Sequence, residues 1–84
     1  GIPLGDGCII DAGLAILAGT KVGIYPAELK KIMEVNANAN MQGEIFKAGQ
    51  LAHFNGLHFR QNSLTGETTV SRSTREIKLN SELH

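Results

Sequence analysis

Branched apolar residues recur at every sixth position near the start of the chain. They are Leu4, Ile10, Ile16 and Val22, and a glycine follows three places after each of the first three, at Gly7, Gly13 and Gly19. A helix repeats every 3.6 residues and a simple strand every 2, so neither produces this spacing. A parallel β-helix does, because each hexad forms one side of a triangular coil. We therefore predict that each apolar residue points inward and each glycine lies near a corner, where a backbone without Cβ turns readily.

The fourth position after each of the first three anchors supports this interpretation. Cys8, Leu14 and Thr20 stand there, where a second inward and often small residue is expected. Three hexads, residues 4–21, make one coil of the left-handed kind. That hand departs from the usual right-handed crossover, so it needs independent support. The alternative is a glycine-rich loop whose spacing is coincidental.

After Ile24 the pattern changes to that of a helix. Pro26 suits the first helical turn, and Glu28 interacts favourably with the helix dipole there. The residues that share the apolar face are Leu29, Ile32 and Met33. This spacing predicts a short helix that packs as a lid rather than one that recognises a partner. Alternating asparagines and alanines over 36–40 weaken the helix, and Gly43 closes the segment.

From Glu44 onward the pattern is that of short strands and turns. Leu57 and Phe59 alternate with His58 and Arg60, which is typical of a half-buried strand. The predicted strands cover 44–48, the stretch around 57–60, 68–72 as the returning arm of a hairpin, and 75–79, with turns at 55–56 and 63–66 and a last helical turn at 81–84.

Composition limits the chain to one domain or less, with 84 residues, eight basic and eight acidic side chains and a net charge of zero. Neither a nucleic-acid surface nor a membrane partner is indicated, because no basic excess and no apolar run of about 20 residues exist. One β-helix coil has two open edges, so we expect either the C-terminal end of a longer protein or a chain that needs partners. The single cysteine, Cys8, is expected to be a buried, inert thiol and is compatible with a reducing cytoplasm.

No catalytic motif is present. The sequence Gly5-Asp6-Gly7 lacks the third glycine of a dinucleotide fingerprint, and no ligand pair among the histidines and Cys8 has a recognised zinc spacing, so no metal is predicted. What remains is a polar cluster, formed by Lys47 and the run Arg60–Ser63. Cationic and amide donors at a strand end suit an anionic ligand that bears phosphate and carbonyl groups. The alternative is a solvated strand edge protected by charge.

Several separate blocks, in order, carry a more specific resemblance. They are GIPLGDGCIIDAGLAILAGTKV, FKAGQL, FRQNSLTGETTV and the terminal IKLNSELH. Together they resemble the last coil and C-terminal region of the tetrahydrodipicolinate N-succinyltransferase family, which are hexapeptide-repeat acyltransferases of lysine and diaminopimelate biosynthesis. The resemblance covers nearly the whole chain except the insert between about Ile24 and Gly43.

This resemblance implies a fold, an activity and a site. The fold is mainly β: the last coil of a left-handed parallel β-helix, then a short helix and a small antiparallel β hairpin cap. The activity is transfer of succinyl from succinyl-CoA to the amino group of tetrahydrodipicolinate, in a cytoplasmic homotrimer whose neighbouring subunits form the coenzyme groove. The residues carried over as coenzyme contacts are Asp11, Ala12, Gly19, Lys47, Arg60, Gln61, Asn62 and Ser63. Asp11 stands where some relatives carry Glu, and Gln61 where some carry Arg.

The catalytic carboxylate of that family is expected upstream, so no catalytic residue is assigned in this chain and the chain alone is expected to be inactive. We expect three parts: a coil at 1–24, a helical insert at 25–43 and a β cap at 44–84. Two other functions fit the sequence. One is a hexapeptide acyltransferase with a different acyl-CoA and acceptor, and the other is a non-catalytic trimerisation cap.

Overall fold

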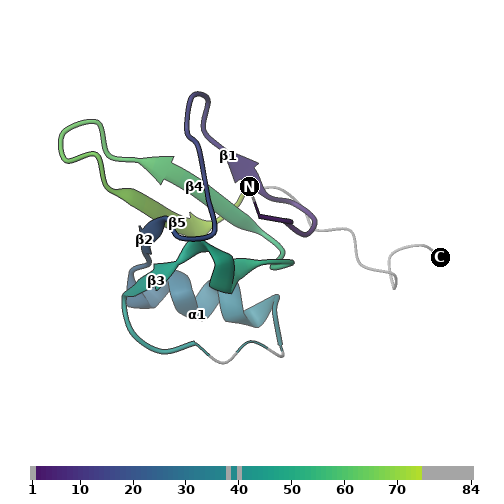
Figure 1. The fold of residues 1–84 in the computed structure, drawn as a ribbon. Coiled ribbons are helices and arrows are strands. Elements are labelled where there is room, and N and C mark those ends of the chain that lie inside the picture. Colours follow the sequence, from purple (N-terminus) through teal and green to yellow (C-terminus); the bar gives the residue numbers. More distant parts are fainter. Residues whose placement is uncertain (1, 38, 40, 75–84) are drawn as a thin grey trace.

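The computed structural model describes residues 2–37, 39 and 41–74. Its elements are β1 (Ile9–Ile10), β2 (Lys21–Gly23), α1 (Pro26–Glu34), β3 (Ile45–Lys47), the 3-10 turn η1 (Ala48–Leu51), β4 (Leu57–Gln61) and β5 (Thr68–Arg72) (Figure 1). The strands form one mixed sheet in the order β1-β4-β5-β2-β3. The predicted fold class is therefore confirmed, a mainly β chain with a β-helix coil, one short helix and an antiparallel hairpin.

The first two dozen residues turn at regular intervals. Turns lie at 6–7, 12–13 and 18–19, six residues apart, and the short segments between them include β1 and β2. Gly7 and Gly13 have φ values of 71° and 81°, a region that residues with a Cβ rarely adopt. The hexad spacing thus identified the corners of the coil correctly.

Two of the four predicted inward residues, Ile16 and Val22, are buried as expected, whereas Ile10 is exposed. Ile16 and Val22 are 8% and 1% exposed, and Leu4 is partly buried against the core, whereas Ile10 is 43% exposed. Ile10 is in register with Phe59, which is fully buried, so both side chains leave the sheet on the same face. Ile10 is exposed because β1 is the edge strand and nothing in the described part of the chain covers it.

One apolar core lies on that face of the sheet. Phe59 and Val70 are cross-strand partners at its centre, and η1 adds Leu51, which is completely buried. The core residues are Ile16, Val22, Ile24, Leu29, Ile32, Phe46, Ala48, Leu51, Leu57, Phe59 and Val70. Cys8 is only half-buried, with Sγ 3.4 Å from the Phe54 carbonyl oxygen, so the prediction of a buried thiol was wrong in degree.

Helix α1 packs against β5 and contributes Leu29 and Ile32 to the core (Figure 1). It ends at Glu34, earlier than the predicted segment. Glu28 ties its first turn to the sheet, since its Oε1 accepts the backbone N–H of Arg72 at 2.9 Å. That hydrogen bond lowers the pKa of Glu28; partial burial opposes the shift, and the Lys31 ammonium, 3.3 Å away, adds to it.

The predicted strand at 57–60 and the returning strand at 68–72 are both present as β4 and β5, an antiparallel hairpin. The short extended segment near 44–48 is β3. The predicted third strand at 75–79 and the last helical turn at 81–84 lie outside the described residues. The three-part division of the chain stays a prediction.

Candidate functional site

The topology of the sheet brings one terminus of every strand to a common end. β1 and β4 are parallel and finish there, β5 and β2 begin there, and β3, antiparallel to β2, also finishes there. All eight predicted contact residues lie at this end, which we call the polar end. They are Asp11 and Ala12 after β1, Gly19 before β2, Lys47 at the end of β3, and Arg60, Gln61, Asn62 and Ser63 in and after β4. Sequence blocks that are distant along the chain therefore share one end of the sheet.

Within the polar end the residues fall into two groups. Asp11 and Arg60 belong to the neighbouring strands β1 and β4, while Gly19 and Lys47 belong to β2 and β3 at the far edge. Strands are about 4.8 Å apart, so the two intervals from β4 to β2 separate the near sides of these groups by about 10 Å, and the four intervals from β1 to β3 separate their far sides by about 19 Å. An elongated ligand can contact both groups across this span.

In the first group, His58 joins Asp11 to Arg60. Its Nε2 lies 2.8 Å from Asp11 Oδ1, and its Nδ1 lies 3.3 Å from Arg60 Nε and 3.2 Å from Arg60 Nη2. An arginine only donates, so Nδ1 must be the acceptor, and the ring proton is assigned to Nε2, which donates to Asp11. The imidazole side chain is 14% exposed and the carboxylate 48%.

His58 was not predicted as a site residue from the sequence, where its spacing only excluded it as part of a zinc site. The alternation along β4 already puts His58 and Arg60 on one face. What the sequence did not reveal is the parallel pairing of β1 with β4, which brings Asp11 to the same face. That pairing joins residues about 50 positions apart, and no local pattern signals it.

The second group is positively charged. Lys21 and Lys47 are register partners on β2 and β3, so both side chains leave the sheet on the same face, and both are exposed. Lys21 was not predicted as a site residue. Like charges directly opposite each other destabilise a strand pair, which favours an anion beside them.

The 18–19 turn is joined to η1, which directly follows Lys47, through backbone hydrogen bonds. Ala48 N–H donates to the Thr20 carbonyl at 2.8 Å, and Gly49 N–H donates to the Ala18 carbonyl at 2.9 Å. No heavy atom lies within 4 Å of the position that a Cβ on Gly19 would take, so this turn is open to a ligand backbone. Ala12, in the 12–13 turn, is likewise exposed.

The hairpin loop uses two of the predicted contact side chains for its own structure. Asn62 Oδ1 accepts the N–H groups of Leu64 and Thr65, at 2.8 and 3.3 Å, which is the geometry of an Asx turn. Gln61 Nε2 donates to the Gly66 carbonyl at 3.3 Å. Ser63 is exposed. Asn62 and Gln61 thus have structural roles here that the sequence analysis did not foresee.

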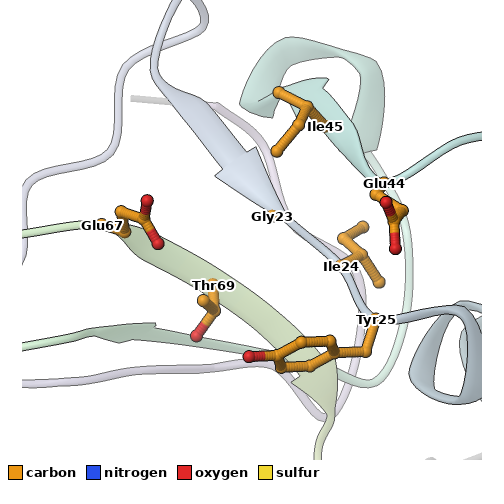
Figure 2. Close-up of a pocket in the computed structure, with 7 residues that line it drawn as sticks. All are labelled: Gly23, Ile24, Tyr25, Glu44, Ile45, Glu67 and Thr69. Carbon is orange, nitrogen blue, oxygen red and sulfur yellow. The ribbon is translucent and has the colours of Figure 1, made fainter. Parts of the chain in front are cut away.

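A shallow pocket of about 200 Å³ lies between β2, β3 and β5 (Figure 2). Its lining residues are Gly23, Ile24, Tyr25, Glu44, Ile45, Glu67 and Thr69. The exposed Tyr25 and Ile45 provide apolar walls, and the carboxylates of Glu44 and Glu67 stand at the rim. None of the eight predicted contact residues lines this pocket, and its carboxylates disfavour an anionic ligand.

Within residues 2–37, 39 and 41–74, no group of three or more His, Cys, Asp or Glu side chains lies close enough to hold a metal ion. Over the same residues, no helix has the length and apolar character needed to cross a bilayer.

Comparison with known proteins gives a single answer. Over its whole length the chain is 58% identical to a 2,3,4,5-tetrahydropyridine-2,6-dicarboxylate N-succinyltransferase of a Sulfurovum species and 60% identical to that of Sulfurimonas denitrificans. The resemblance read from the sequence is confirmed. The chain spans 21% of the length of each of these relatives and matches their C-terminal portion. No family model matches the chain.

A solved structure agrees with this similarity. A crystal structure of a 2,3,4,5-tetrahydropyridine-2-carboxylate N-succinyltransferase from Campylobacter jejuni superposes with a TM-score of 0.77 and is 46% identical in sequence. The match covers 86% of this chain and 18% of that one. The fold described above is therefore shared with a protein that is also named an N-succinyltransferase.

Proposed function

We propose that this chain forms part of the coenzyme-binding surface of an N-succinyltransferase. The reaction is transfer of a succinyl group from succinyl-CoA to the amino group of tetrahydrodipicolinate, a step of lysine and diaminopimelate biosynthesis. The amine attacks the thioester carbonyl, a succinyl amide forms, and coenzyme A leaves as the thiol. The catalytic carboxylate is expected outside the chain.

One observation carries this proposal. The eight residues that the family resemblance marks as coenzyme contacts come from four separate segments, and the sheet gathers all of them at the polar end. Coenzyme A is elongated and anionic, with phosphates at one end and an amide-rich arm. Arg60 on β4 and Lys47 on β3 lie three strand intervals apart, about 14 Å, and this spacing suits such a ligand better than it suits a compact anion.

The side chains divide into two roles. Arg60 and Lys47 supply positive charge for phosphate or carboxylate groups, and Lys21 adds to that charge beside Lys47. The exposed turns at Ala12 and Gly19 offer backbone N–H and C=O groups to the pantetheine amides. Holding thioester and amine together supplies rate: fixing two reactants in a productive geometry is worth on the order of 7–11 kcal/mol in favourable cases.

The test is steady-state kinetics of the complete enzyme that contains this chain, with Arg60→Ala and Lys47→Ala. A charge-assisted hydrogen bond contributes about 1.5–3 kcal/mol, so each change is expected to raise the KM for succinyl-CoA about tenfold or more. Lys30→Ala is the matched control, because Lys30 is exposed on α1, away from the polar end, and its KM should equal that of the parent. An unchanged KM in both test variants contradicts the assignment.

The same preparation separates the alternatives. A panel of acyl-CoA donors and amine acceptors distinguishes this enzyme from another hexapeptide acyltransferase. Calorimetry with succinyl-CoA distinguishes both from a non-catalytic trimerisation cap, which should produce no heat of binding.

We also propose that the working assembly is a cytoplasmic homotrimer with the groove between neighbouring subunits. Supporting this are the large apolar side chains that remain exposed on the described part of the coil and sheet, including Ile10 and Leu17 at 43% and 63% and Ile45 at 69%. Native mass spectrometry of the complete enzyme should give three times the subunit mass, and a monomer at working concentration contradicts the proposal.

A further inference from the structure

We propose that His58 is a positioning residue that holds Arg60 in place only while the imidazole is neutral, so that proton uptake by His58 weakens coenzyme binding. This inference rests on the proposed function, since it assumes that Arg60 contacts the anionic end of the coenzyme. It assigns a role to a histidine that the resemblance did not mark.

The geometry fixes which protonation state can hold Arg60. The guanidinium approaches Nδ1 through both Nε and Nη2, at 3.3 and 3.2 Å, and Nδ1 accepts only while it carries no proton. On the opposite side of the ring, Nε2 donates to Asp11 Oδ1 at 2.8 Å. Asp11 thereby holds the ring in the tautomer that leaves Nδ1 free to accept.

Adding a proton to Nδ1 changes the two sides of the ring in opposite directions. The contact with Asp11 becomes an ion pair and strengthens. On the other side, the protonated Nδ1 becomes a donor that faces the two N–H donors of Arg60. Both side chains are then positively charged, so this contact is lost. The Arg60 guanidinium then leaves the position that it occupies beside His58, while Asp11 and His58 remain in contact.

The other neighbours do not reverse this conclusion. On β5 the register partners of His58 and Arg60 are Ser71 and Thr69, which do not titrate near neutral pH. On α1, Glu28 is close enough to Arg60 for the guanidinium to contribute to the lowering of the pKa of Glu28, and its carboxylate is committed to the Arg72 backbone. Among the residues that the structure describes, the charged groups in direct contact with the ring are thus Asp11 and Arg60.

The experiment measures the KM for succinyl-CoA and kcat of the complete enzyme from about pH 5.5 to 8, the range in which histidines take up a proton. We expect KM to rise as the pH falls, approaching the value of Arg60→Ala, which is about tenfold above the parent. At saturating coenzyme, kcat should follow the same pH profile in the parent and in the His58 variants. The second ionisation of a phosphate monoester also falls near pH 6, so the comparison is made between variants with the same ligand.

Three variants isolate the histidine. His58→Gln keeps a donor and an acceptor but cannot take up a proton, so its KM should lose the part of the pH dependence that His58 causes. His58→Leu should raise KM at neutral pH and above and converge with the parent as the pH falls, and combining it with Arg60→Ala should add no further increase. His53→Asn is the control, because His53 is an exposed loop histidine with φ 68°, a conformation that asparagine tolerates, and it should keep the parent profile.

A spectroscopic readout is independent of activity. The ¹⁵N chemical shifts of the His58 ring in the complete enzyme near pH 8 should show the Nε2–H tautomer and should change in Asp11→Asn. A ring found as the Nδ1–H tautomer overturns the inference, as does a His58→Gln enzyme whose KM keeps the parent pH profile while Arg60→Ala raises KM. If instead Arg60→Ala leaves KM unchanged, the proposed function fails, and with it the coupling of His58 to coenzyme binding.

Discussion

The end of α1 is fastened to the turn before β4 by one side chain, Asn36, and its removal is expected to loosen both. Asn36 Nδ2 donates to the carbonyls of Ile32 and Asn55 at 2.7 and 3.0 Å. Its Oδ1 accepts the Asn55 backbone N–H at 2.8 Å. Asn36→Ala removes all three hydrogen bonds and adds no bulk.

The size of the effect follows from those contacts. A typical intramolecular hydrogen bond contributes about 0.5–1.5 kcal/mol net, so three give about 1.5–4.5 kcal/mol. Asn36 and Asn55 are half-buried, and water can replace part of the lost bonding, which favours the lower part of that range. We expect local stability around the Asn55–Gly56 turn to fall by about 2 kcal/mol.

Hydrogen exchange of the complete enzyme measures this locally. Because about 1.4 kcal/mol corresponds to a factor of ten, amides of the 53–56 segment should exchange about 30-fold faster in Asn36→Ala. The Gly56 amide, which donates to the Asp6 carbonyl, reports whether the loosening reaches the coil. Asn62→Ala is the matched control, since the side-chain bonds of Asn62 remain within the distant hairpin loop, and the 53–56 amides should then be unchanged. Unaltered protection of those amides in Asn36→Ala refutes the reasoning.

Two further predictions concern the coil and the helix. Gly5→Ala should lower the melting temperature of the complete enzyme, because a Cβ there overlaps Asn55 Oδ1 and lies 2.8 Å from the Phe54 carbonyl oxygen; overpacking of this kind costs about 1–3 kcal/mol, and Gly19→Ala, with open space, should cost little. The folded pKa of Glu28 is lowered, so its contribution to stability is present above the unfolded pKa and lost as the pH falls through the folded pKa. The melting temperature of Glu28→Gln should therefore lie below that of the parent at neutral pH and converge with it in acid, whereas Glu34→Gln, at an exposed position, should match the parent throughout. A gap that does not narrow as the pH falls contradicts the Glu28 argument.

The local elements were predictable because each has a local physical cause. Turn positions in the coil follow from glycines that can adopt positive φ, as Gly7 and Gly13 do. The helix begins at Pro26 because a fixed φ and a missing N–H suit the first turn. Alternation along 57–60 identified β4 and its buried face. None of these needs information from elsewhere in the chain.

The composition of the candidate site was only half predictable, because part of it depends on which strands pair. Asp11 and Arg60 were expected as separate contacts, and the sheet joins them through His58, which the sequence did not single out. The Asn62 side chain carries a donor and an acceptor that suit a ligand. Its oxygen instead accepts a hydrogen bond within the Asx turn of its own loop. A family resemblance assigns a role to a residue without its neighbours. It therefore does not predict where a local hydrogen bond replaces a ligand contact.

The exposure of Ile10 shows that a repeat pattern predicts the direction of a side chain and not its burial. A hexad specifies the direction in which a side chain leaves the sheet, and Ile10 does leave on the face of Phe59. Burial needs a second layer over that face, and at the edge strand β1 the described chain provides none. Buried fraction is therefore a property of the assembly, while direction is a property of the repeat. In the complete enzyme we expect Ile10 to be covered, so Ile10→Ala should destabilise that enzyme by an amount typical of a core substitution, about 2–5 kcal/mol. A surface-like loss below about 0.5 kcal/mol contradicts this expectation and leaves the coil open at that side.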